Sequence, residues 1–157
     1  SKKMATTTAT ITLSSSDLLT DNLSLSATMN LNKGGTTATG LDELNYHRAI
    51  IPTGTNFTLI QESAALNATG SNYVYIINKN EDVTDYVTVS IRSEIIGKLY
   101  AGDWMFIPYS DATTATAGAD DPSGDDSDIE IRAYTHDCTI EYAMFHDGET
   151  LLTASDS

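Results

Sequence analysis

The residues of this chain whose types and spacing could support chemistry are few, and the clearest group is His136-Asp137-Cys138. His136 and Cys138 stand two residues apart, so on a strand they would share one face and could share a metal ion. A structural zinc site needs paired ligand spacings, and the sequence offers no second pair. A nucleophilic cysteine needs a base oriented by a third group, which adjacency does not supply. We interpret the group as a turn with a small buried thiol and predict no metal, no cofactor and no catalytic residue.

The acidic run from Asp120 to Asp128 is a second group, because carboxylates are the oxygen ligands that calcium prefers. The run lacks the EF-hand spacing and a bidentate acid at its end. It belongs to a stretch of Ala, Thr, Gly and Asp over about residues 109–127 that has almost no apolar bulk. We predict a solvated acidic surface loop and keep calcium binding as a minor alternative.

The aromatic side chains are a third group, because an exposed row of them could line a sugar-binding face. Most alternate with aliphatic residues, a pattern typical of core and edge packing. They are Tyr73, Tyr75, Tyr100, Trp104, Phe106, Tyr109, Tyr134, Tyr142 and Phe145. Trp104 and Tyr109 lie near a turn and a loop, and we predict that these two are exposed anchors at an interface.

Length, charge and cysteine content limit the class of protein. The 157 residues suit one domain, and the net charge of -14 argues against DNA or RNA, since phosphate binding depends on Lys and Arg. The single cysteine allows no disulfide within the chain and fits assembly in a reducing cytoplasm. No apolar signal-peptide core follows Lys3, and no run of about 18 apolar residues occurs, so we expect neither secretion nor a membrane span.

Alternation of apolar and polar residues predicts short strands along most of the chain. It is clearest over residues 22–31, where Leu23, Leu25, Ala27, Met29 and Leu31 share one face. Further strands are predicted over residues 11–13, 44–51, 57–60, 73–77, 86–91, 94–100, 103–107, 129–134 and 139–145. Residues 62–67 are the one place that suits a helical turn.

The connections complete the predicted fold. Short polar links predict a hairpin between residues 73–77 and 86–91 and another between 129–134 and 139–145, and Gly102 supplies a tight reversal in Ala101-Gly102-Asp103. We predict an all-β antiparallel sandwich, jelly-roll-like, made of residues 11–157 with the acidic loop inserted at about 109–127. Residues 1–10 would form an extended N-terminal arm.

The segment EIIGKLYAGDWMFIP at Glu94 to Pro108 resembles small virion structural proteins of tailed bacteriophages. One pattern recurs in those proteins: a leucine, two further residues, Gly-Asp or Gly-Glu, an aromatic residue, an aliphatic run and a proline, in that order. Residues 73–78 and 140–145 are similar to the strand before that segment and to the closing strand. Residues 5–13 are similar to the Thr-rich start, and the acidic insertion at 111–127 departs from the shortest versions.

The resemblance implies a non-enzymatic capsid decoration, or cement, protein that binds the outer head surface in many copies and stabilises the shell. Its partners would be the major capsid protein or other virion subunits, and it would be a homo-oligomer, preferably a trimer, located in the virion after assembly in the host cytoplasm. Thr6, Thr7 and Thr8 would bind a neighbouring subunit by adding a strand to one of its exposed sheet edges. Trp104 and Tyr109 would be the other partner-binding residues. A tail, neck or fibre-associated β-domain is the alternative, and a carbohydrate-binding module is a less favoured one.

Overall fold

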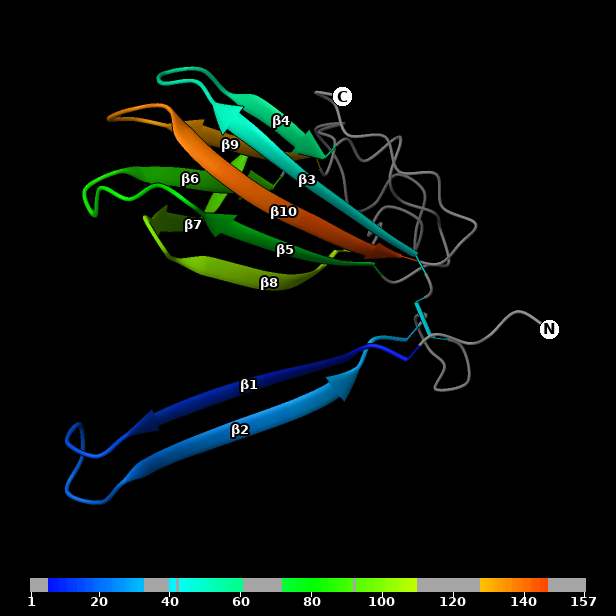
Figure 1. Cartoon of the computed structure of the whole chain (residues 1–157), viewed down its shortest axis with the longest axis vertical. Coiled ribbons are helices and arrows are strands. Elements are labelled where there is room, and N and C mark those ends of the chain that lie inside the picture. The colour runs from blue at the N-terminus through cyan, green and yellow to red at the C-terminus, as the bar shows by residue number, and fades with distance from the viewer. Residues whose placement is uncertain are drawn as a thin grey trace.

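The computed structural model describes residues 6–32, 40–41, 43–60, 72–91, 93–109 and 128–146, and all regular structure in them is β (Figure 1). The all-β prediction is confirmed. The strands are β1 (Thr8–Ser15), β2 (Leu23–Asn30), β3 (Glu43–Ile51), β4 (Phe57–Ile60), β5 (Asn72–Asn78), β6 (Tyr86–Ile91), β7 (Glu94–Tyr100), β8 (Trp104–Tyr109), β9 (Ile129–Ala133) and β10 (Cys138–His146).

Strands β3 to β10 form two antiparallel four-stranded sheets that pack face to face, which confirms the predicted sandwich. The front sheet has the order β3-β10-β5-β8, and the back sheet has the order β4-β9-β6-β7. Every second side chain of each central strand points between the sheets, because successive residues of a strand face opposite sides. Fully buried members of this core are Ile51, Val74, Ile76, Val87, Val89, Ile129, Ile140 and Met144.

The connections differ from those predicted. Strands β5 and β6 lie in opposite sheets, and so do β9 and β10, so the two predicted hairpins are wrong. Only the β6–β7 connection joins neighbours in one sheet of the sandwich, and every other connection from β3 to β10 crosses between sheets. A short polar link between two alternating strands fits both arrangements, because each strand buries one face either way.

The turn at Ala101-Gly102-Asp103 makes one of these crossings, from β7 to β8. Gly102 has a φ of 88°, which residue i+2 of a type II turn requires and which side chains disfavour. The amide of Asp103 donates to the carbonyl of Tyr100 at 2.9 Å, and the amide of Gly102 donates to the carbonyl of Asn78 at 2.8 Å. The predicted reversal is present, and it is also fastened to the end of β5.

Strands β1 and β2 form a separate two-stranded antiparallel sheet, called the hairpin below, which projects beside the sandwich (Figure 1). Thr8 pairs with Asn30 and Ser15 pairs with Leu23 without a shift of register. The predicted boundary of the arm at residue 10 therefore falls inside β1, and the sandwich begins at β3 and not at residue 11. At the base of the hairpin, the amide of Leu31 donates to the carbonyl of Thr7 at 2.8 Å.

Three predictions concern residues outside the described part of the chain. These are the start of the arm at residues 1–5, the helical turn at 62–67, and the acidic loop beyond Tyr109, at 110–127.

Candidate interaction surface

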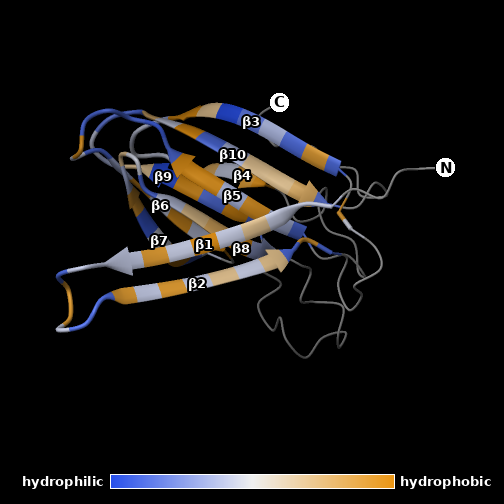
Figure 2. Cartoon of the chain, turned by 60° about the horizontal axis from the view of Figure 1, so that its bottom comes forward, coloured by the Kyte–Doolittle hydropathy of each residue, from blue (hydrophilic) through white to orange (hydrophobic). Residues whose placement is uncertain are grey.

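The hairpin has one apolar face and one hydroxyl-rich face. Residues paired across two antiparallel strands point to the same side, so the register places the pairs Ala9–Met29, Ile11–Ala27 and Leu13–Leu25 together (Figure 2). The other side carries Thr and Ser with Asn30, and there Thr10 Oγ1 lies 3.0 Å from Thr28 Oγ1. The alternation predicted over residues 22–31 is correct, yet of its apolar face only Leu31, at the base of the hairpin, is buried, and it lies outside the core cluster of the sandwich. Leu13 is 51% exposed and Leu25 is 54% exposed.

The outer face of the front sheet is also apolar. A sheet with one face in water normally alternates apolar residues toward the core with polar residues toward solvent. Here most of the outward residues are apolar as well: Leu44, Tyr46, Ile50, Tyr73, Tyr75, Ile77, Trp104, Phe106, Pro108, Ala143 and Phe145. The outward charges of these four strands are Arg48 and Glu141, which form an ion pair at 3.1 Å. The front sheet is therefore apolar on both sides.

Ring contacts hold the outer aromatic side chains in place. The rings of Tyr73 and Phe106 stack at 5.5 Å between centroids, and those of Tyr75 and Trp104 are tilted at 6.3 Å. Phe145 meets Phe106 edge-on at 6.5 Å. Such pairs give a fixed and rigid surface, which loses little side-chain entropy when a partner covers it.

The outer face of the back sheet provides the contrast within the same chain. Its central strands point Thr88, Ser90, Glu130 and Arg132 outward. The ammonium group of Lys98 lies over the ring of Tyr86, 3.8 Å from its centroid. Ile95 and Ile96 are exposed apolar residues here, and they lie on the edge strand β7. The back sheet has the polar outer face of a solvated sheet, so the apolar outer face is specific to the front sheet.

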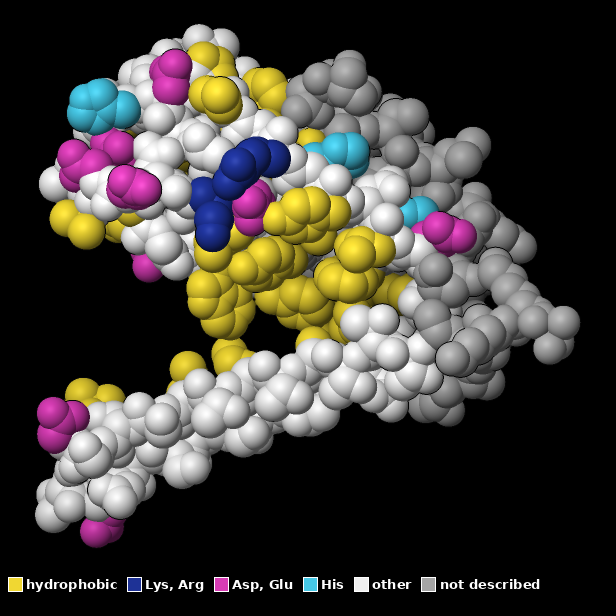
Figure 3. Space-filling model, viewed as in Figure 1, with side chains coloured by type: hydrophobic (Ala, Val, Ile, Leu, Met, Phe, Trp, Pro, Cys, Tyr) yellow, Lys and Arg dark blue, Asp and Glu magenta, His cyan; other side chains and the backbone are white. Residues whose placement is uncertain are grey.

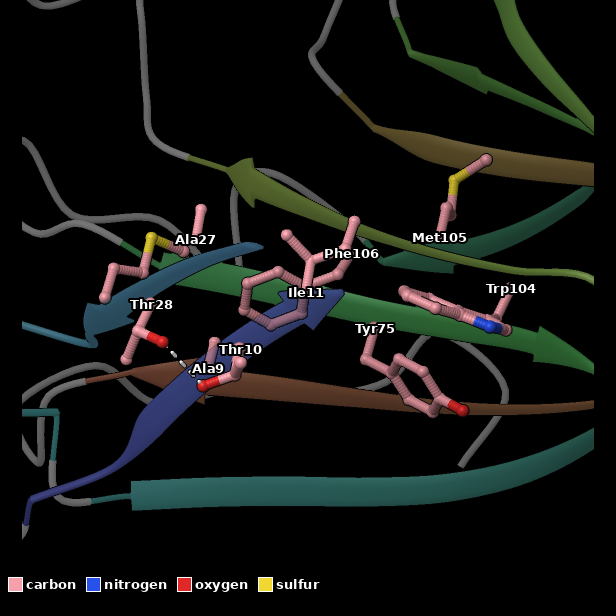
Figure 4. Close-up of a pocket in the computed structure, with 10 residues that line it drawn as sticks. Ala9, Thr10, Ile11, Ala27, Thr28, Tyr75, Trp104, Met105 and Phe106 are labelled. Atoms are coloured by element: carbon pink, nitrogen blue, oxygen red, sulfur yellow. Dashed lines mark hydrogen bonds between the residues drawn. The ribbon is translucent and has the colours of Figure 1, made fainter. Parts of the chain in front are cut away.

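The two apolar surfaces face each other across a cleft of about 630 Å³ (Figures 3 and 4). The hairpin lines it with Ala9, Thr10, Ile11, Ala27, Thr28 and Met29, and the front sheet with Tyr75, Trp104, Met105 and Phe106. Figure 3 shows that the hydrophobic side chains of the sandwich gather on the side that faces the hairpin and that the space widens toward the hairpin tip. Large apolar side chains of the same two surfaces are about half exposed, namely Ile11, Leu13, Leu25 and Met29 on the hairpin and Leu44, Tyr46, Ile50 and Trp104 on the front sheet.

The predicted partner-binding residues divide into two groups. Trp104 is 52% exposed and lies in the cleft, as an exposed anchor would. Tyr109 is 3% exposed and packs in the core, so its prediction as an exposed anchor was wrong. It ends β8 on the inward side, two residues after Ile107. Thr6 is exposed, while Thr7 and Thr8 already hydrogen-bond within the chain, to Leu31 and Asn30 respectively.

Most residues of this surface were missed at the level of sequence. Tyr75 and Phe106 were assigned to core or edge packing, Ile11, Leu13 and Leu25 were predicted only to lie on strands, and Tyr46 was not singled out. A signal was present in residues 73–77 and 104–108, which are apolar without any polar alternation. Such a run is typical of a strand that is covered on both faces.

The His136-Asp137-Cys138 group forms part of a polar network that joins two loops. The carboxylate of the buried Asp85 accepts hydrogen bonds from Thr135 Oγ1 at 3.0 Å and Asn80 Nδ2 at 2.8 Å, and its Oδ1 lies 2.7 Å from Nδ1 of His136. The hydrogen bond from His136 holds the pKa of Asp85 below its usual value, and the same bond raises the pKa of His136. The network fastens the loop before β6 to the loop between β9 and β10.

Cys138 is buried beside this network, which confirms the predicted buried thiol. Burial raises its pKa to about 11, so the thiol stays protonated near neutral pH and is a poor nucleophile. Its sulfur lies 3.4 Å from the backbone carbonyl of His136, and the imidazole is engaged by Asp85. The His136-Asp137-Cys138 group therefore stabilises a turn and lacks the geometry of a reactive Cys–His pair.

Replacing His136 by Ala is expected to lower stability at pH 5 more than at pH 8.5. The pKa of His136 is raised from 6.5, so its bond stabilises the fold fully below pH 6.5 and is lost as the pH rises through the folded-state value. The lowered pKa of Asp85 keeps that carboxylate charged at pH 5. Urea unfolding at the two pH values measures the difference. Thr135→Ala removes a neutral hydrogen bond to the same carboxylate and should act equally at both, and an equal loss for His136→Ala would contradict the prediction.

Over the described residues, no group of three or more His, Cys, Asp or Glu side chains could hold a metal ion. The same part of the chain contains no helix long and apolar enough to cross a membrane. Comparisons with protein-family models, with curated proteins and with solved structures find no match to this chain.

Proposed function

We propose that this chain is a non-enzymatic structural protein of a tailed-bacteriophage virion, a decoration protein that binds the outer surface of the head in many copies and stabilises the shell. The observation that carries the proposal is the front sheet, which is apolar on both faces and stands beside a hairpin with an exposed apolar face. Contiguous apolar surface of this extent is typical of interaction sites, and those between proteins are among them. A protein with this surface is built to be part of an assembly.

The order of the strands supports a shell protein. Counted from β3, the sheets run 1-8-3-6 and 2-7-4-5, which is the order that the two Greek keys of a jelly roll produce. Jelly rolls are common among viral capsid domains, and also among lectins, so this argument is an analogy of fold alone.

The segment that resembles phage virion proteins lies at the proposed surface. Residues 94–108 form β7, the turn at Gly102 and most of β8, and β8 lines the cleft with Trp104 and Phe106. Strand β8 thus belongs both to the segment that carries the resemblance and to the apolar surface. A net charge of -14 also suits the outside of a head, away from packaged DNA.

A carbohydrate-binding module is less well supported. That reading needed Trp104 and Tyr109 exposed on one face, and Tyr109 is buried. The outward side chains around Trp104 include Ile77, Phe106 and Pro108, which offer no hydrogen bonds to sugar hydroxyls.

Binding of the purified chain to expanded, DNA-free heads of the same phage tests the proposal. We expect saturable binding in many copies at symmetry-related positions on the outer surface, together with a higher temperature of head disruption. Electron cryomicroscopy of complete virions locates the chain independently. No binding to heads, or density for this chain only in the tail, neck or fibres, would refute the decoration role, and the second result would support the alternative of a tail-associated β-domain.

A further inference from the structure

We propose that copies of this chain associate by exchanging arms, the apolar face of the hairpin of one copy packing on the outer face of the front sheet of a second copy. The inference names the occupant of the cleft and does not depend on the particle to which the chain belongs. The two contacting surfaces are the two large apolar surfaces of the described part of the chain.

The distribution of charge favours a second copy as the occupant. The chain has a net charge of -14, so copies repel one another unless they meet through uncharged surface. The sixteen residues of β1 and β2 carry no charge, and the hairpin has acidic residues only in its turn, at Asp17 and Asp21. The outward charges of the front sheet, Arg48 and Glu141, neutralise each other. Both surfaces therefore let two acidic chains come together.

The amount of exposed apolar surface matches an interface between proteins. The four large hairpin side chains and four large front-sheet side chains that are exposed on the two apolar surfaces are 40–67% exposed. At about 150 Å² for a large side chain, they leave roughly 600 Å² of apolar surface per copy. A specific interface buries roughly 800 Å² per partner. Arm exchange would cover most of this surface in both copies at once.

The shape of the two elements fits the exchange. Strands β1 and β2 have eight residues each, and β10 and β5 at the centre of the front sheet have nine and seven, so the hairpin is long enough to cover the sheet. Within one copy the hairpin meets the sheet near its base and stands away from it toward the tip (Figure 3). A two-stranded sheet is marginally stable by itself, so the hairpin needs another surface packed against its apolar face. The front sheet of the same copy covers that face only in part.

Sedimentation equilibrium of the full chain at about 1–100 μM, without heads, tests the proposal. The wild-type chain should associate, and Leu13→Glu should weaken association by at least roughly 100-fold, because two apolar contacts per pair of copies are lost. Thr12→Glu is the matched control, since it adds the same charge one residue away on the hydroxyl-rich face. If Leu13→Glu fails to fold by circular dichroism, Leu25→Glu with Ser26→Glu as its control repeats the test on the paired strand.

A mixing experiment separates hairpin-to-sheet contact from other modes of association. Trp104→Glu places a charge on the outer face of the front sheet and leaves the apolar face of the hairpin unchanged, whereas Leu13→Glu does the reverse. Each variant alone should therefore be monomeric. Their mixture keeps one intact hairpin and one intact sheet, and it should associate. Trp104 is the only tryptophan of the chain, so the tryptophan fluorescence of the mixture, excited selectively, comes only from the Leu13→Glu copy. Its emission should shift to shorter wavelength when the sheet of that copy is covered.

Three results would overturn arm exchange. The first is a wild-type chain that stays monomeric at 100 μM, whether the hairpin stands open or closes on its own sheet. The second is a Leu13→Glu variant that associates as strongly as Thr12→Glu. The third is a mixture of Trp104→Glu and Leu13→Glu that stays monomeric. Because no heads are present, these results are independent of the decoration role. Head binding by a monomeric chain would leave the proposed function standing and remove only the exchange.

Discussion

A chain without residues 1–32 is expected to keep a folded sandwich and to lose binding to phage heads by at least roughly 10-fold, because attachment in many copies depends on contacts that add up. The core cluster of the sandwich begins at Ala49 and includes no residue of β1 or β2, so the deletion leaves that cluster complete and removes one buried side chain, Leu31, at the base of the hairpin. It does remove the apolar face that includes Ile11, Leu13 and Leu25. The hairpin is thus expected to serve association and not folding.

Circular dichroism, thermal unfolding and co-sedimentation with heads measure the two parts of this prediction. A shorter deletion of residues 1–10 is a poor substitute, because it would leave Thr28, Met29 and Asn30 without their partners in β1. Thr12→Ala with Ser26→Ala, a change confined to the hydroxyl-rich face, serves as the control and should bind heads like the wild type. Full occupancy on heads by the truncated chain, or loss of its β-sheet signal, would show that the hairpin has a different role.

Replacing Ile140 by Ala is expected to destabilise the protein by about 3–4 kcal/mol. Ile140 is fully buried in β10, which lies between β3 and β5 in the front sheet. The substitution removes apolar contacts and leaves a cavity that a sheet paired on both sides cannot collapse to fill. Since domains of this size are stable by about 5–15 kcal/mol, the loss is a large part of the total.

Urea unfolding followed by circular dichroism measures this effect, with Thr139→Ala as the control. Thr139 is the neighbouring residue, and its half-exposed side chain points to the outer face, so its loss should cost at most about 1 kcal/mol. Its backbone amide, which donates to Asn80 Oδ1 at 2.8 Å, is unchanged in the variant. Equal effects of the two substitutions would mean that the front sheet does not bury Ile140 as described.

The positions of the strands could be predicted because local periodicity determines them. Residues 22–31, 73–77, 86–91 and 139–145 all lie in strands close to the predicted limits. The reversal at Gly102 could also be predicted, since a positive φ in a tight turn favours glycine. The buried thiol of Cys138 followed from the absence of any partner group that would make it reactive.

The sequence by itself thus determined an all-β chain of short alternating strands with a charge-free segment between Met4 and Ser16. Only the tertiary structure decided which strands pair, that β5 and β6 lie in opposite sheets, and that the front sheet is apolar outside as well as inside. Periodicity states that neighbouring residues face opposite sides, but it does not state what covers each side. Leu13 and Ile140 have similar local patterns, and only the packing of distant strands buries Ile140 and leaves Leu13 exposed.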